Sequence, residues 1–241
     1  MSNEYLNILE RSENIVFLPS VGKLYGKNGS IFKNQRKLLI LGESFYCIDK
    51  HEKCNGKCSA KKVKENRDCR FWSESVVFDE HVAARNSGIK NKWVQGYLSC
   101  EKAFFGYEVD PQLRTHFWNS VCFYNYFTEP QDGPSQNLSF SDETWERSKK
   151  AFIDVINILQ PDAVICWGNR TWECLPDFGE RVDSIKTDDI TGEVWFYPFK
   201  DKNEGTYVLL HSPHPSRPIG NSFDLWHEVY KIFLKDFYNF A

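Results

Sequence analysis

The sequence predicts an α/β fold, a three-layer α/β/α sandwich with a central, mainly parallel, four-stranded sheet. Short continuous aliphatic runs that close on glycine, at 38–42 and 163–168, are typical of parallel strands buried on both faces. Segments with helical spacing of apolar residues alternate with the strand-like runs, as in layered α/β domains. The 241 residues contain no linker rich in Pro, Gly or Ser, so we expect one domain over 1–241.

Each strand follows from its own residues. The run 38–42 reads Leu-Leu-Ile-Leu-Gly and predicts the first strand. The aromatic and β-branched run 117–127 predicts the second strand and the loop that leaves it. The apolar run 163–168 predicts the third and 208–210 the last, while 195–197 is also strand-like.

The helices are predicted from their end signals. A helix is expected around 80–87, and Ser141 is suited to cap a longer helix that must end before Pro161. Asn169 can cap a helix that starts near Thr171, and Ser222 can cap a closing helix with one aromatic face. A short helical start precedes all of these.

Composition and charge narrow the class of protein. With 41% hydrophobic residues, 8 Trp and 19 Phe, the chain can bury a substantial core. Residues 1–14 lack a signal-peptide pattern and no apolar stretch is long enough to cross a bilayer, so we expect a cytoplasmic protein without a membrane partner. The net charge is −3, but residues 23–70 hold thirteen Lys or Arg against five Asp or Glu. This positive stretch surrounds the first strand, and it predicts either an attraction for phosphates or a solvated surface.

Polar residues follow the first strand where open α/β sheets bind their ligands. Gly42 permits close approach of a ligand to the backbone, and Glu43, Ser44, Phe45 and Tyr46 add a carboxylate, a hydroxyl and two rings. We therefore expect residues 42–46 to form one wall of an active site.

The ends of four predicted strands carry a succession of short motifs. These are Gly-Glu-Ser-Phe-Tyr at 42–46, an Asn-bearing aromatic segment at 119–125, Trp-Gly at 167–168 and His-Pro-Ser at 214–216. In this order, the motifs resemble those of the uracil-DNA glycosylase superfamily, over roughly residues 38–218. The resemblance implies the fold of that superfamily and an enzyme that removes a base from DNA.

The resemblance also implies a role for each matched residue. His214, held between two prolines, would donate to the oxygen of the departing base. A carboxamide can read a pyrimidine edge, and either Asn119 or Asn125 would supply it. Tyr46 would form an aromatic wall of the base pocket, and Glu43 would polarise a water or stabilise the charged sugar.

The chain departs from the best-known branch of that superfamily at several positions. Ser44 stands where that branch has the water-activating Asp, and Phe45 replaces a Pro. After His-Pro-Ser, in which Ser216 would contact the substrate, Arg217 can hold a phosphate and Ile219 can act as a wedge in DNA. A surface loop is the alternative interpretation of these last residues. The base removed can thus be uracil or a modified pyrimidine.

A Cys-rich, basic insert is predicted at about 47–70. It is rich in Lys, Asn and Gly, so apolar burial cannot order it, whereas four thiolates can bind a metal ion tetrahedrally. We expect a structural zinc site, with an iron–sulfur cluster as the rival. The candidate ligands are Cys47, Cys54, Cys58 and Cys69.

The sequence therefore predicts a hydrolase of the DNA glycosylase class, with DNA as partner and no cofactor needed for catalysis. Glu43 and His214 are its predicted catalytic residues. A catalytically inactive nucleic-acid-binding module of the same fold is one alternative, since Ser44 lacks an evident base. A glycosidase acting on free nucleosides or nucleotides is the other.

Overall fold

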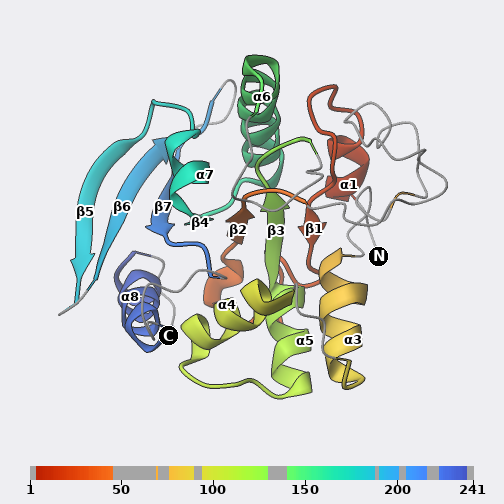
Figure 1. Cartoon of the computed structure of the whole chain (residues 1–241), viewed down its shortest axis with the longest axis vertical. Coiled ribbons are helices and arrows are strands. Elements are labelled where there is room, and N and C mark those ends of the chain that lie inside the picture. Colours follow the sequence, from red (N-terminus) through yellow and green to blue (C-terminus); the bar gives the residue numbers. More distant parts are fainter. Residues whose placement is uncertain are drawn as a thin grey trace.

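A seven-stranded mixed sheet forms the centre of the protein, with the strand order β1-β3-β2-β4-β7-β6-β5 (Figure 1). Strands β3, β2, β4 and β7 are parallel to one another, while β1, β6 and β5 pair in the antiparallel sense. The computed structural model describes residues 4–45, 69, 76–89, 94–129, 140–187, 190–200, 205–215 and 223–237. Within these ranges, no helix combines the length and the apolar character needed to span a membrane.

The four parallel strands are the ones that the sequence predicted. Strands β2 (Leu38–Gly42), β3 (Val121–Asn125) and β4 (Ala163–Trp167) are buried at all five of their residues, and β7 (Thr206–Ser212) is buried along most of its length. Helices pack on both faces, so neither face needs polar residues, and the strands read as unbroken apolar runs.

The predicted number of four strands is too small. The short β1 (Ser20–Val21) extends one edge, and β5 (Glu180–Lys186) with β6 (Thr191–Pro198) forms an antiparallel ribbon on the other (Figure 1). In β5, five of seven residues are exposed. A strand at a solvent-facing edge needs no apolar run, so the polar sequence of β5 carried no strand signal.

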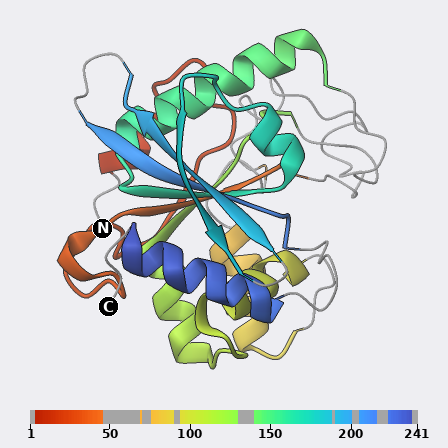
Figure 2. The same ribbon diagram turned by 90° about the vertical axis from the view of Figure 1, so that its left-hand side faces the viewer.

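Helices on both faces complete two separate cores. On one face, α6 (Asp142–Leu159) packs through Phe152, Val155 and Leu159 on the side chains of alternate strand residues, with α1 (Glu4–Leu9) beside it. The opposite face is covered by α4 (Gln95–Phe105), α5 (Pro111–Ser120) and α8 (Phe223–Asp236). Figure 2 shows α6 and α8 on opposite sides of the sheet. The shorter elements are η1 (Lys33–Gln35), the π-helix η3 (Val76–Ala83), α3 (Ala84–Asn86) and α7 (Asn169–Glu173).

Two helix starts differ from their predictions, while a third is confirmed. Residues 117–120 belong to α5 rather than to a strand, because Asp110 caps this helix at the Gln112 and Leu113 amides and Pro111 fixes its first turn. The cap of α7 is Gly168 rather than Asn169. Ser141 caps α6 as predicted, accepting a hydrogen bond from the Thr144 amide at 3.2 Å. Ser222 lies outside the described residues.

A buried ionic network joins the helices of the second core. The Glu101 carboxylate in α4 is 1% exposed and accepts hydrogen bonds from Arg114 Nε at 3.1 and 3.2 Å and from Trp118 Nε1 at 2.8 Å. His81 Nε2 of η3 lies 2.7 Å from the same carboxylate. Glu101 therefore ties η3 and α5 to α4, and its charge is balanced by the buried Arg114 guanidinium.

The variant Glu101→Gln tests this network. It leaves the Arg114 guanidinium buried without a counter-charge, so we expect the free energy of unfolding to fall by about 3–5 kcal/mol, measured by urea denaturation. The control is Glu108→Gln, which removes an exposed carboxylate that pairs with Arg85 at 3.0 Å. Glu108→Gln should lower the free energy of unfolding by less than about 1 kcal/mol. Equal effects of the two variants would contradict a structural role for the network.

Candidate active site

The four parallel strands end level with one another at the carboxyl edge of the sheet. Gly42, the last residue of β2, pairs in register with Asn125, the last residue of β3. Trp167, the last residue of β4, pairs with Ser212, the last residue of β7, and β2 and β4 are paired up to the residue before. Neighbouring strands lie about 4.8 Å apart, so the four ends span about 14 Å. The motifs that follow these strands therefore share one edge.

The amide of Asn125 lies against the backbone of Gly42. A Cβ atom placed on Gly42 would be 2.3 Å from Asn125 Oδ1 and 2.8 Å from the ring of Phe123. Only glycine fits at this position without displacing one of them. Asn125 is 5% exposed, and within the described part of the chain its side chain makes no hydrogen bond. A buried carboxamide in this state is suited to bind a polar group of a ligand.

His214 lies over the end of β4. Its ring and the ring of Trp167 make a T-shaped contact with centroids 6.0 Å apart, and its Cβ would be 3.4 Å from a Cβ placed on Gly168. A Cβ on Gly96, in the first turn of α4, would lie 3.9 Å from His214 Cε1. The imidazole is thus held between the end of β4 and the start of α4.

Two buried rings connect His214 to the Gly42–Asn125 contact. Phe123 and Trp167, here called the aromatic pair, have ring centroids 5.6 Å apart. Phe123 touches Gly42 at one end, and Trp167 touches His214 at the other. An unbroken row of contacts therefore runs from Asn125 to His214 at this end of the sheet, through two rings of the second core.

Glu43 pairs with an arginine that the sequence analysis did not single out. Arg170 Nε, in α7, lies 2.6 Å from Glu43 Oε1, and the two side chains are 29% and 12% exposed. Arg170 follows the Trp-Gly motif by two residues. Its position just after a predicted strand end was the feature of the sequence that could have marked it as a candidate site residue. The pair joins the end of β2 to the turn after β4.

The end of β7 is fixed from two sides. The Ser212 carbonyl accepts a hydrogen bond from the Gly168 amide at 2.7 Å, and the Ser212 hydroxyl lies 2.9 Å from the Tyr230 hydroxyl of α8. Burial raises the pKa of the Tyr230 phenol well above its usual range, so this group stays protonated. These contacts hold the strand end from which His214 projects two residues later.

Ser44 and Phe45 differ in what they face. Ser44 is 9% exposed, and its hydroxyl is buried without a hydrogen-bond partner among the described residues. Phe45 packs edge to face on Phe17, with centroids 4.8 Å apart, and belongs to the core beneath α6. The structure therefore places Phe45 in a core rather than in a substrate site.

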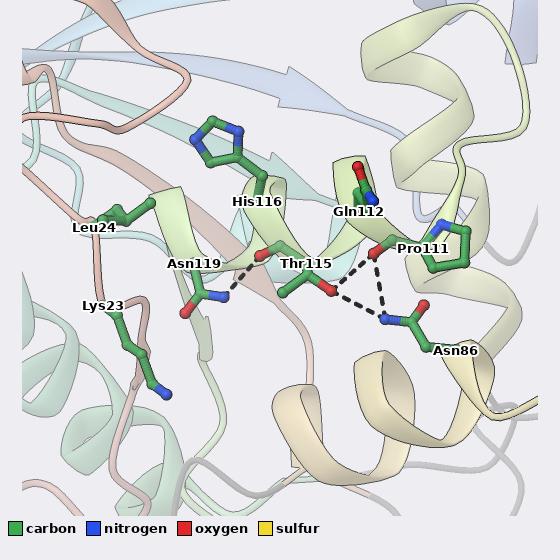
Figure 3. Close-up of a pocket in the computed structure, with 8 residues that line it drawn as sticks. All are labelled: Lys23, Leu24, Asn86, Pro111, Gln112, Thr115, His116 and Asn119. Atoms are coloured by element: carbon green, nitrogen blue, oxygen red, sulfur yellow. Dashed lines mark hydrogen bonds between the residues drawn. The ribbon is translucent and has the colours of Figure 1, made fainter.

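Asn119 does not lie with the other predicted site residues. It is in α5, before β3, so it lies at the amino edge of the sheet, and its Nδ2 donates to the Thr115 carbonyl at 2.7 Å. It lines an open pocket of about 650 Å³. Figure 3 draws the residues of this pocket. The other lining residues are Lys23, Leu24, Asn86, Pro111, Gln112, Thr115 and His116. Of the two asparagines left open by the sequence, only Asn125 reaches the strand ends.

The first part of the positive stretch near β2 lies away from the carboxyl ends of the strands. Residues 23–37 precede β2 and so lie at the amino edge, where the Arg36 guanidinium and the Lys37 amide bind the Asp162 carboxylate at 3.0 and 2.7 Å. Two of its basic residues are therefore engaged at the edge opposite to the candidate site. Its second part, apart from Cys69, lies outside the described residues.

Several predicted site residues are not described. Cys69 is partly buried and packs against the core beneath α6. Among the described residues, no group of three or more His, Cys, Asp or Glu side chains can hold a metal ion. The metal site stays a prediction because most of its candidate ligands are not described. The predicted residues outside the described ranges are Tyr46, Cys47, Cys54, Cys58, Ser216 and Arg217.

The variant Gly42→Ala tests the close contact at the end of β2. The added methyl group must displace the Asn125 amide or the Phe123 ring, so we expect a loss of about 1–3 kcal/mol in unfolding free energy, measured by urea denaturation. The control is Gly96→Ala, where the nearest atom is 3.9 Å from the new Cβ. Since alanine favours a helix over glycine, this control should be neutral or stabilising. A neutral Gly42→Ala would show that the strand ends are not packed as described.

Comparisons with known proteins give no family for the chain. No protein-family model matches it, and no curated protein does. The function of the site must therefore be inferred from its geometry and chemistry.

Proposed function

We propose that this protein is a DNA glycosylase-like hydrolase that cleaves the N-glycosidic bond of a flipped uracil or modified pyrimidine in DNA. The observation that carries the proposal is the row of contacts from Asn125 to His214 at the carboxyl edge of the parallel strands. The Asn125 carboxamide, at the end of β3, and the His214 imidazole, after β7, lie at the same edge of the sheet. The Glu43 carboxylate follows β2, the strand between β3 and β4.

The order of the motifs supports the same proposal. The Gly-Glu, Asn, Trp-Gly and His-Pro segments resemble those of the uracil-DNA glycosylase superfamily, and in this chain each begins at the end of a parallel strand. We propose that the domain is an α/β/α sandwich of that kind, extended by the β5–β6 ribbon. Asn125 then takes the role for which Asn119 was the alternative.

The carboxamide of Asn125 suits the recognition of a pyrimidine edge. It presents one acceptor and two donors in a plane, which matches the carbonyl and N–H groups of uracil-like bases. Its burial limits the access of competing water, and the aromatic pair, itself buried, gives the site an apolar floor. Discrimination would come from the pattern of donors and acceptors rather than from charge.

In the proposed reaction, one residue stabilises the negative charge on the departing base and another stabilises the positive charge on the sugar. The bond between C1′ and the base nitrogen breaks, and its electron pair leaves with the base. His214 stabilises the negative charge on the base oxygen by donating a hydrogen bond. The Glu43 carboxylate stabilises the positive charge on the sugar and orients water. The water oxygen bonds to C1′ and releases a proton to solvent, and the departed base takes up a proton from solvent.

Ser44 is suited to hydrogen bonding rather than to the activation of water. Its buried hydroxyl has no base among its described neighbours, so it cannot take a proton from water. Glu43, the residue before it, is the nearest carboxylate in the chain. We therefore assign to Glu43 the stabilisation of the charged sugar, and to Ser44 a hydrogen bond with the substrate.

Base release from a panel of DNAs tests the proposal. Single- and double-stranded oligonucleotides with uracil or one of several modified pyrimidines are incubated with the protein, and alkali then reveals abasic sites. We expect release from at least one substrate. The variants His214→Ala and Asn125→Ala should each slow it by about 10²–10³-fold, the usual cost of losing one preorganised donor.

The matched control is Asn119→Ala, an identical change at the opposite edge of the sheet, which should leave the rate unchanged. Protein that binds DNA but releases no base from any substrate would favour an inactive binding module instead. Turnover of free nucleosides, with none on DNA, would favour a nucleoside glycosidase. Equal losses for Asn119→Ala and Asn125→Ala would contradict the location of the site.

A further inference from the structure

The Glu43–Arg170 pair occupies a defined place at the edge of the site. Its Nε–Oε1 distance of 2.6 Å is short for an ion pair, and the carboxylate is 12% exposed, less than half as much as the guanidinium. The pair also bridges separate strands, since Glu43 follows β2 and Arg170 lies just after β4. The arginine therefore fixes where the carboxylate points relative to the end of β4.

The backbone of Arg170 is itself held firmly. Gly168 turns the chain into α7 with φ +88°, and its carbonyl accepts from the Trp172 amide at 3.1 Å. The Trp172 ring stacks on His211 of β7 with centroids 4.9 Å apart. The Cys174 thiol donates to the Arg170 carbonyl at 2.7 Å. Helix α7 is therefore anchored to the same two strands that carry the Trp-Gly motif and His214.

The titratable groups near the pair can be named for the described part of the chain. Cys174 lies within electrostatic reach of both Glu43 and Arg170, and also of Glu173 and Lys149. Burial, reinforced by Glu173, raises the pKa of the Cys174 thiol to about 12, so it stays neutral. Lys149 in α6 lies 3.3 Å from Glu146. Among the described residues, Arg170 is a cation in direct contact with Glu43.

We infer that Arg170 is a positioning residue that keeps Glu43 ionised and directed at the sugar, so that Glu43 acts as a fixed negative charge rather than as a proton acceptor. This inference rests on the function proposed above. An adjacent guanidinium stabilises a carboxylate and makes it a weaker base. A weak base is poorly suited to take a proton from water, whereas a fixed negative charge still stabilises a developing sugar cation.

The first experiment measures Glu43 directly, without turnover. In protein labelled with ¹³C at the glutamate carboxyl carbon, the Glu43 signal is assigned by its absence from the Glu43→Gln variant and then titrated with acid. We expect the midpoint to move to higher pH by about one unit or more in Arg170→Gln, because the favourable charge is lost. Arg170→Lys keeps a positive charge and should restore part of the shift.

The second experiment repeats the base-release assay against pH. The acidic limb of the pH–rate profile should move in Arg170→Gln in the same direction as the Glu43 midpoint, and Arg170→Gln should have little further effect in a Glu43→Gln background. The matched control is Arg181→Gln, which removes a half-exposed arginine of β5 that pairs with Glu193 at 3.4 Å. It should move neither the midpoint nor the limb.

The outcomes separate the inference from the proposed function. A Glu43 midpoint that does not respond to Arg170→Gln overturns the inference, whatever the activity. A loss of rate that is the same at every pH and persists in the Glu43→Gln background also overturns it, and assigns Arg170 to phosphate binding or to folding. If the wild type releases no base while the midpoint moves, the proposed function fails, and with it the positioning role in catalysis.

Discussion

The absence of a side chain at Gly42 is the constraint on which the site depends. It lets β2 and β3 end side by side with the Asn125 carboxamide pressed against the backbone, 2.3 Å from where a Cβ would lie. The same space admits the Phe123 ring, which in turn contacts Trp167. A methyl group would separate these contacts, so one missing side chain sets the spacing of the proposed pocket.

The strand ends also contain a buried polar group that is expected to lower the stability of the fold. The Ser44 hydroxyl is buried without a hydrogen-bond partner among the described residues. Such groups usually cost about 1–3 kcal/mol each when left unsatisfied. In the second core, by contrast, the Glu101 carboxylate is contacted by Arg114, Trp118 and His81. The unpaired Ser44 hydroxyl lies at the strand ends, where a ligand is proposed to bind.

Much of the fold could be predicted because a strand that is buried on both faces of the sheet has an unbroken run of apolar residues. Strands β2 and β4 read as apolar runs, and Ser141 marks the start of α6. Strand β5 left no such trace because its residues face solvent. Residues 117–120 were assigned to a strand because aromatic residues suit strands, whereas the Asp110-Pro111 start signal extends a helix through them.

The site was only partly predictable, for a different reason. Glu43, Asn125 and His214 follow strands, so their shared edge could be expected from the parallel topology. The choice between Asn119 and Asn125 depended on where β3 begins, and a few residues decide which edge of the sheet an asparagine occupies. Arg170 could not be paired with Glu43 from sequence, because that contact arises from the register of β2 and β4.

The position of β7 has a consequence for how the molecule is assembled on the ribosome. This strand follows β5 and β6 in the chain, yet it lies between β4 and β6 in the sheet. The β5–β6 hairpin emerges first, but it joins the rest of the sheet only through β7. The same late strand leads to His214, so a nascent chain holds its carboxylate and carboxamide before it acquires its imidazole.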